Sequence, residues 1–278
     1  MLSSIKKYWI ELLAFGVVFG VLLLTAIPDI TWVNTDSDGP HYIYSAKYLY
    51  PAHKTSAPLF LLLGNLFLRM PIGLEAWRLA MLSVIATTVA VVFIYLIVKN
   101  KTGNKWYGIA ASLVYGSSAL VISQSIIVET YALVTMFAVA AFYFAERKRW
   151  VWCAIMLGAG GAVHHLIIFP IIVFLVLFSK FRKWKYIGVM ASFLVFYAYI
   201  PISKTLLNPP DIWGNLTVTE FLVDNVTTML MLWGGLSIWD LLKRILDTIG
   251  ILGVSLTIAI IPIVWYIKIR HDSTNPIR

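Results

Sequence analysis

The chain has 278 residues, of which 60% are hydrophobic and only 13% are charged. An ordinary soluble domain carries about 25% charged residues, so this composition excludes one. It also excludes a transmembrane barrel, whose strands alternate apolar and polar residues over about ten positions, because the apolar runs here are long and unbroken. The composition therefore predicts an all-α polytopic membrane protein.

The net charge of +9 and the single cysteine carry less information. In a soluble protein such a charge would suggest nucleic acid, but in a membrane protein the positions of the basic residues report topology. Because Cys153 is the single cysteine, no disulfide can form within the chain. It lies inside an apolar run. We interpret Cys153 as a packing residue.

Eight apolar segments approach the length of about 20 residues that a membrane-spanning helix needs. Lys6 and Lys7 precede the first of them as in a signal peptide, but no small-residue cleavage site precedes Pro28. We expect an uncleaved first span. The segments cover residues 8–28, 73–98, 106–127, 129–145, 150–163, 166–179, 186–203 and 247–267.

Basic residues gather in five clusters beside these segments, and short cytoplasmic loops are enriched in lysine and arginine. Eight crossings place all five clusters, and both termini, in the cytoplasm, and leave the outer side net acidic. The chain is then a multi-pass protein of a prokaryotic plasma membrane or of the endoplasmic reticulum. The clusters lie at residues 6–7, 99–105, 147–149, 180–185 and 268–278.

Residues 150–179 allow two interpretations. One continuous helix would be about 45 Å long, against a hydrocarbon core of about 30 Å, and would put the cluster at 180–185 outside. Two short helices that meet at His164 and His165 keep this cluster in the cytoplasm. We prefer the broken helix, which membrane proteins tolerate where the backbone is buried in protein or faces a water-filled cavity.

The whole chain, residues 1–278, is expected to form one membrane domain with two outer loops. The first loop, residues 29–72, is polar and aromatic, and its apolar stretch Pro58–Leu68 is too short to span, so we expect a helix in the membrane interface. The second loop covers residues 204–246. Both loops face the same compartment.

Two carboxylates open the first loop. Asp36 and Asp38 stand two apart on an irregular segment, an arrangement suited to a general base or to a divalent cation. The alternative is a solvated turn, because Asp, Ser and Gly are turn formers.

Glu129 and His164-His165 lie where apolar segments end. An acid at the edge of the hydrocarbon is costly enough to indicate function, although a carboxylate that reaches interfacial water would look the same. Adjacent histidines on a helix point about 100° apart, so only one can face a given site. At least one is expected to be structural.

Five outer cations are available to an anionic headgroup or a lipid-linked phosphate. Snorkelling to the interface explains them equally well. The sequence has no glycine-rich phosphate loop, zinc spacing, Ser-His-Asp order or nucleic-acid module. The cations are Arg69, Arg78, Lys204, Lys243 and Arg244.

Four stretches, in order along the chain, together resemble the GT-C class of membrane glycosyltransferases, and within it the protein O-mannosyltransferase-like family. Three positions depart from the family pattern: His41 stands in place of Glu, Lys54-Thr55-Ser56 in place of Pro-Pro-Gly, and Asn215 in place of Asp. The matching stretches are Asp38-Gly39 with Ala52-His53 and Pro58-Leu59-Phe60; Val128 to Leu133; Gly161 to His165; and Trp213 to Thr217 with Phe221-Leu222.

This resemblance implies transfer of mannose or another hexose from a polyprenyl-phosphate donor to a protein or lipid hydroxyl on the outer or lumenal face. It implies Asp38 as general base, shaped by Asp36 and Glu129, with inversion and no cofactor; a divalent ion at Asp36 and Asp38 is the alternative. A non-catalytic subunit of a membrane complex, or a flippase of lipid-linked sugars, remains open. The substrate-binding residues expected are His53, His41, Arg78, His165, Trp213, Lys243 and Arg244.

The positions of the basic clusters give the first testable prediction. Cysteines placed at Lys101, Arg147 and Arg182 should resist an impermeant thiol reagent in intact cells, whereas cysteines at Thr55 and Thr219 should react, because the positive-inside rule puts the first three in the cytoplasm. Labelling of position 182 from outside would instead show that residues 150–179 form one span.

Overall fold

The computed structural model describes residues 2–30, 38–52 and 57–207, and in the remainder Ser237, Trp239, Asp240, Leu242, Lys243, Leu246 and Asp247. Every regular element in these ranges is a helix. The all-α prediction is thus confirmed for the described part of the chain. The predicted span 247–267 lies almost wholly outside it.

Three helices in the described residues are long and apolar enough to cross a membrane: Tyr8–Thr25, Glu75–Thr102 and Trp184–Ser203. A fourth span results if α5, Lys105–Gly116, and α6, Ala119–Ser125, count together, although they are bent by 64°. Apolar helices of this kind indicate an integral membrane protein. The count of eight crossings stays a prediction.

The long helices are α1, Leu2–Thr25, and α4, Glu75–Thr102, together with the continuous run of α10, Trp184–Ser192, η4, Phe193–Ala198, and α11, Tyr199–Leu207. Of the shorter helices, α7, Tyr131–Glu146, packs against α4, and α8, Trp150–Val163, packs against α7 and α10. The third, α9, Ile168–Leu177, contacts α8 and the short helix that precedes it. Gly103, with φ of 69°, ends α4 in the left-handed conformation that glycine adopts without strain.

The predicted break at the two histidines is observed. α8 ends at Val163, and His164 is extended, with φ of −160° and ψ of 144°. The Leu166 N–H donates to His164 Nδ1 at 3.2 Å, which opens the short helix η2, His165–Ile167. The side chain of His164 therefore satisfies a backbone donor that the break leaves without a helical partner.

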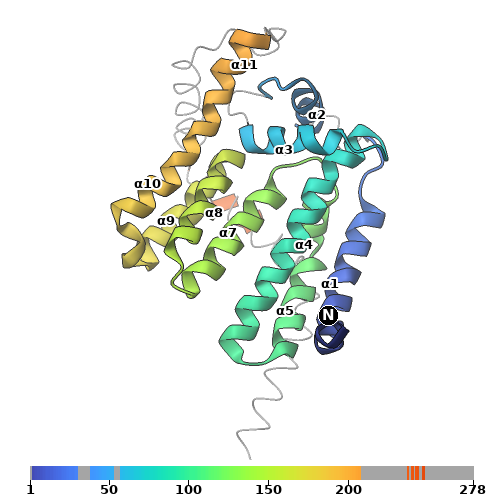
Figure 1. Cartoon of the computed structure of the whole chain (residues 1–278), viewed down its shortest axis with the longest axis vertical. Helices are drawn as coiled ribbons and strands as arrows, with labels where there is room; N and C mark the ends of the chain where they lie inside the picture. The colour runs from blue at the N-terminus through green and yellow to red at the C-terminus, as the bar shows by residue number, and fades with distance from the viewer. Residues whose placement is uncertain are drawn as a thin grey trace, which may run out of the picture.

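Two short helices of the first loop lie across one end of the bundle (Figure 1). They are α2, Gly39–Tyr48, and α3, Pro58–Leu68, and each has a proline in its first turn, where the missing N–H costs nothing. The bounds of α3 are those predicted. The α4–α5, α7–α8 and α9–α10 turns, which carry basic clusters, lie toward the opposite end with the N-terminus (Figure 1).

Side-chain donors fix α2 and α3 to each other and to α4. Asn65 Nδ2 donates to the Ala46 carbonyl at 2.8 Å. The Arg78 guanidinium donates to the carbonyls of Leu68 and Met70, the latter at 3.1 Å. These bonds satisfy carbonyls that the helix ends leave free.

Two side chains of α11 bind the backbone just after α2. Tyr199 Oη donates to the Tyr50 carbonyl at 2.8 Å, and Ser203 Oγ donates to the Leu49 carbonyl at 2.6 Å. Leu49 itself has a left-handed backbone, with φ of 56°, at the end of α2. The first loop is thus positioned by contacts more than 140 residues away in sequence.

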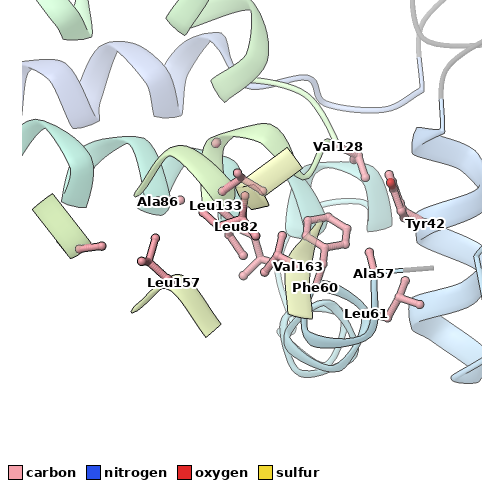
Figure 2. Close-up of a cluster of buried hydrophobic side chains, with 14 of the residues drawn as sticks. Tyr42, Ala57, Phe60, Leu61, Leu82, Ala86, Val128, Leu133, Leu157 and Val163 are labelled. Atoms are coloured by element: carbon pink, nitrogen blue, oxygen red, sulfur yellow. The ribbon is translucent and has the colours of Figure 1, made fainter. Parts of the chain in front are cut away.

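A single large apolar cluster joins α2 and α3 to the bundle, with Phe60, Leu61, Leu82, Leu133 and Val163 among its buried members (Figure 2). Small residues let the helices approach closely. A Cβ at Gly64 would lie 2.6 Å from Leu79 Cδ1 of α4 and 3.1 Å from Ala46 Cβ of α2.

This contact predicts that Gly64→Ala lowers the free energy of unfolding by about 1 to 3 kcal/mol, because the added methyl overpacks a buried three-helix contact. Thermal unfolding in detergent measures the effect. Gly16→Ala is the matched control, since nothing lies within 4 Å of its added Cβ, and its stability should stay level or rise slightly. Equal behaviour of the two variants would refute close packing at Gly64.

Candidate functional site

The acids Asp38 and Glu129 are far apart in sequence but lie near the same buried phenol, that of Tyr42. Asp38 has an exposed side chain and precedes α2, where its carbonyl accepts the Tyr42 N–H at 2.9 Å. Tyr42 is only 1% exposed. Burial raises the pKa of the Tyr42 phenol above its usual range, and the charges of Asp38 and Glu129 raise it further. Both carboxylates therefore lie near the same ring.

Glu129 lies in the linker between α6 and α7 and is 7% exposed. Its Oε2 accepts the Thr130 N–H at 3.3 Å, and Ser83 Oγ of α4 donates to the Glu129 carbonyl at 3.0 Å. Burial raises the pKa of Glu129 to about 7; the Thr130 N–H opposes this rise, and the charge of Asp38 adds to it. Glu129 is thus a tethered carboxyl that titrates near neutral pH.

The walls of this site are aromatic and apolar. Tyr42 and Phe60 meet edge to face, with ring centroids 5.0 Å apart. Tyr42, Phe60, Val128 and Val163 belong to one buried cluster drawn from α2, α3, the α6–α7 linker and α8 (Figure 2). Such a wall keeps water from Glu129, whereas Asp38 stays exposed.

His164 enters the site from the break after α8. It is 8% exposed, and its ring centroid lies 5.7 Å from that of Tyr131, two residues after Glu129. Because Nδ1 accepts a backbone N–H, the proton of the neutral ring lies on Nε2. His165, which the sequence analysis selected, is half-buried and lies 4.1 Å from His164 between ring centroids.

One family model matches residues 38–186, more than half of the chain, and it is described as the protein O-mannosyl-transferase TMEM260 N-terminal domain. The chain belongs to this family. The match begins at Asp38 and includes Tyr42, Glu129 and His164. No curated protein and no solved structure matches the chain. Membership confirms the resemblance read from the sequence and implies a glycosyltransferase with a sugar donor and a protein acceptor.

Within this O-mannosyl-transferase domain, Arg78 and His41 have distinct places. The Arg78 guanidinium is directed to the end of α3, where it donates to Leu68 and Met70. Its observed contacts are therefore structural, and phosphate binding by Arg78 stays a prediction. His41 is half-buried in the first turn of α2, three residues after Asp38.

Other predicted site residues lie outside the described part of the chain: Asp36, His53, Trp213 and Arg244. Lys243 is described and exposed. Among the described residues, no group of three His, Cys, Asp or Glu side chains could hold a metal ion. The alternative metal pair, Asp36 and Asp38, has one member outside these residues.

Sequence reasoning missed Tyr42, and of the two adjacent histidines it selected His165 rather than His164. Tyr42 is one of several tyrosines in an aromatic loop, and nothing in the sequence marks it as the buried one. His164 had a signal, because the first polar residue after a helix break is placed to accept a free N–H. The structure brings Asp38, Glu129 and these two side chains to one end of the bundle.

The raised pKa of Glu129 predicts a pH-dependent stability. From about pH 4.5 to about pH 7 the native carboxyl keeps a proton that the unfolded chain has released, so stability falls as the pH rises through this window. Glu129→Gln removes the ionisation and should gain at most about 3 kcal/mol relative to wild type at pH 8, and little at pH 4. Unfolding of both proteins across this range measures the gain; the same gain at both pH values would contradict the assignment.

Proposed function

We propose that this chain transfers mannose from a polyprenyl-phosphate donor to a protein hydroxyl, at the end of the bundle covered by α2 and α3. The observation that carries the proposal is that Asp38 and Glu129 lie near the same buried phenol, Tyr42, and that the charges of both raise its pKa. All three residues belong to the matched O-mannosyl-transferase segment. This end of the bundle is the outer or lumenal one in the topology predicted above. The two predicted outer loops, residues 29–72 and 204–246, are on the same side of the membrane as the site in that topology.

Asp38 is the general base in this proposal. Its side chain is exposed, whereas Glu129 is buried. It also precedes the N-terminus of α2, where the helix dipole favours a charged carboxylate. An acceptor hydroxyl has a pKa far above 7, so its proton must pass to a base as its oxygen attacks, a contribution of about 10² to 10⁴-fold.

The reaction forms one bond and breaks one bond at the anomeric carbon. The acceptor oxygen attacks from the face opposite the phosphate, the carbon–oxygen bond to phosphate breaks with its electron pair, and the acceptor proton goes to Asp38. The configuration at carbon inverts. The polyprenyl phosphate leaves as an anion and needs cations rather than a proton.

Glu129 tunes this base. With a pKa of about 7, it holds its proton for about half of the time at neutral pH. The protonated form spares Asp38 the repulsion of a second negative charge. His164 Nε2–H is a further donor at the same end.

The remaining predicted residues bind substrate in this proposal. The leaving phosphate is held by Lys243, by Arg244 and by the guanidinium nitrogens of Arg78 other than Nη1, which bonds to the carbonyls of Leu68 and Met70. The sugar and acceptor contacts come from His41, His53, His165 and Trp213. If a divalent ion takes part, Asp36 and Asp38 supply its carboxylate ligands.

The central test is Asp38→Asn, which keeps shape but cannot take the proton. Turnover of a polyprenyl-phosphate mannose donor by the purified full chain should fall at least about 10²-fold, with donor binding nearly unchanged. Single-turnover rates and donor Kd measured on one preparation separate these quantities.

Two variants control for position and charge. Asp36→Asn should cost less than Asp38→Asn. Asp29→Asn should cost little, because Asp29 is an exposed acid whose carboxylate accepts the neighbouring Ile30 N–H at 2.8 Å. A larger loss at Asp36 would move the base to that residue. Unchanged turnover in Asp38→Asn would refute its role, and a chain that binds donor without turnover would be a non-catalytic subunit.

A further inference from the structure

Two hollows flank Glu146 at the end of the bundle away from Asp38 and Glu129. The first has a volume of about 220 Å³ between α4 and α7, and Lys101, Arg147 and Tyr143 line it with Ile97 and Asn100. The second has a volume of about 320 Å³ beside the α7–α8 turn, and Lys148, Trp150 and Lys180 are among its lining residues. Glu146 lines both.

The hollows carry a net positive charge. Lys101 Nζ lies 2.6 Å from Glu146 Oε2, so the one acid is already paired. The Arg147 guanidinium lies 4.7 Å from the Tyr143 ring centroid. Within the described part of the chain, no carboxylate forms an ion pair with Arg147, Lys148 or Lys180. Three cations therefore remain for an anion.

The backbone of the α7–α8 turn supports a role for this charge. Lys148 has φ of 57°, and its N–H donates to the Ala145 carbonyl at 2.8 Å while Arg149 N–H donates to Phe144 at 2.9 Å. This is the helix ending in which glycine or asparagine normally holds the left-handed position. A lysine stands there against its backbone preference, and it adds a cation to the second hollow.

The depth of the hollows matches a lipid headgroup. Along α4, Lys101 lies 18 residues after Ser83, which holds the Glu129 carbonyl, or about 27 Å at about 1.5 Å per residue. A hydrocarbon core is about 30 Å thick. Ser83 and Lys101 are therefore about one membrane thickness apart along α4, and if Glu129 lies at one interface, the hollows lie at the other.

Exposed tryptophans mark the same end. Trp9, Trp106, Trp152 and Trp184 lie near the ends of α1, α5, α8 and α10 that face it, and each is at least half exposed, Trp184 at 84%. Tryptophan is enriched at headgroup depth in membrane proteins. This belt argues for a lipid rather than a soluble anion as the occupant.

We propose that the hollows beside Glu146 bind the headgroup of an anionic phospholipid in the leaflet opposite the transferase site. Arg147 presents a guanidinium fork to the phosphate, and Lys148 and Lys180 lie around the second hollow. The acyl chains run along the apolar faces of the helices. Basic hollows between membrane helices are known to bind such headgroups.

The test uses the purified full chain in a neutral detergent with added dioleoyl phosphatidylglycerol, dioleoyl phosphatidylcholine or inorganic phosphate. Phosphatidylglycerol should raise the Tm saturably, and phosphatidylcholine and phosphate should not. Arg147→Gln should weaken the apparent affinity for phosphatidylglycerol by about tenfold, because one charged hydrogen-bonding group is lost.

Arg149→Gln is the matched control, since Arg149 is an exposed arginine of the same turn that lines neither hollow. Its affinity should stay within about twofold of wild type. Asp38→Asn should also bind phosphatidylglycerol normally, which separates this site from the donor site. Equal stabilisation by phosphatidylcholine or by inorganic phosphate, or equal losses in the two arginine variants, would overturn the proposal.

Discussion

The proposed transferase site depends on donors for backbone carbonyls at the ends of short helices, because water is scarce at membrane depth. α2 and α3 end near the bundle, and side chains of other helices satisfy three of the carbonyls there: Ala46 from Asn65, Leu68 from Arg78 and Tyr50 from Tyr199. These bonds fix the first loop on the bundle. Asp38 is held beside the α6–α7 linker only because α2 is held.

Glu129 is balanced between two opposing effects. Burial disfavours its charge, whereas the Thr130 N–H favours it. Burial dominates, so the carboxyl titrates near pH 7 rather than near 4.5. A carboxyl of this kind changes its charge within the physiological pH range while its position stays fixed. This property suits an acid that shares a site with a second acid.

Much of the fold could be predicted where the sequence itself ends an element. Pro58 and Arg69-Met70-Pro71 bound α3, and the two histidines interrupt residues 150–179, so both features were predicted correctly. What could not be predicted depends on contacts between helices. The choice of His164 over His165 follows from one backbone N–H, and the contacts of Arg78 follow from where α3 ends relative to α4.

α4 connects the two ends of the molecule. Near its start Arg78 holds α3 and Ser83 holds the Glu129 linker, and near its end Lys101 pairs with Glu146 of α7. Since α4 is one unbroken helix of 28 residues, the proposed transferase site and the hollows beside Glu146 rest on one rigid element. The two lie about 27 Å apart along its axis, at about 1.5 Å per residue, so neither contacts the other directly.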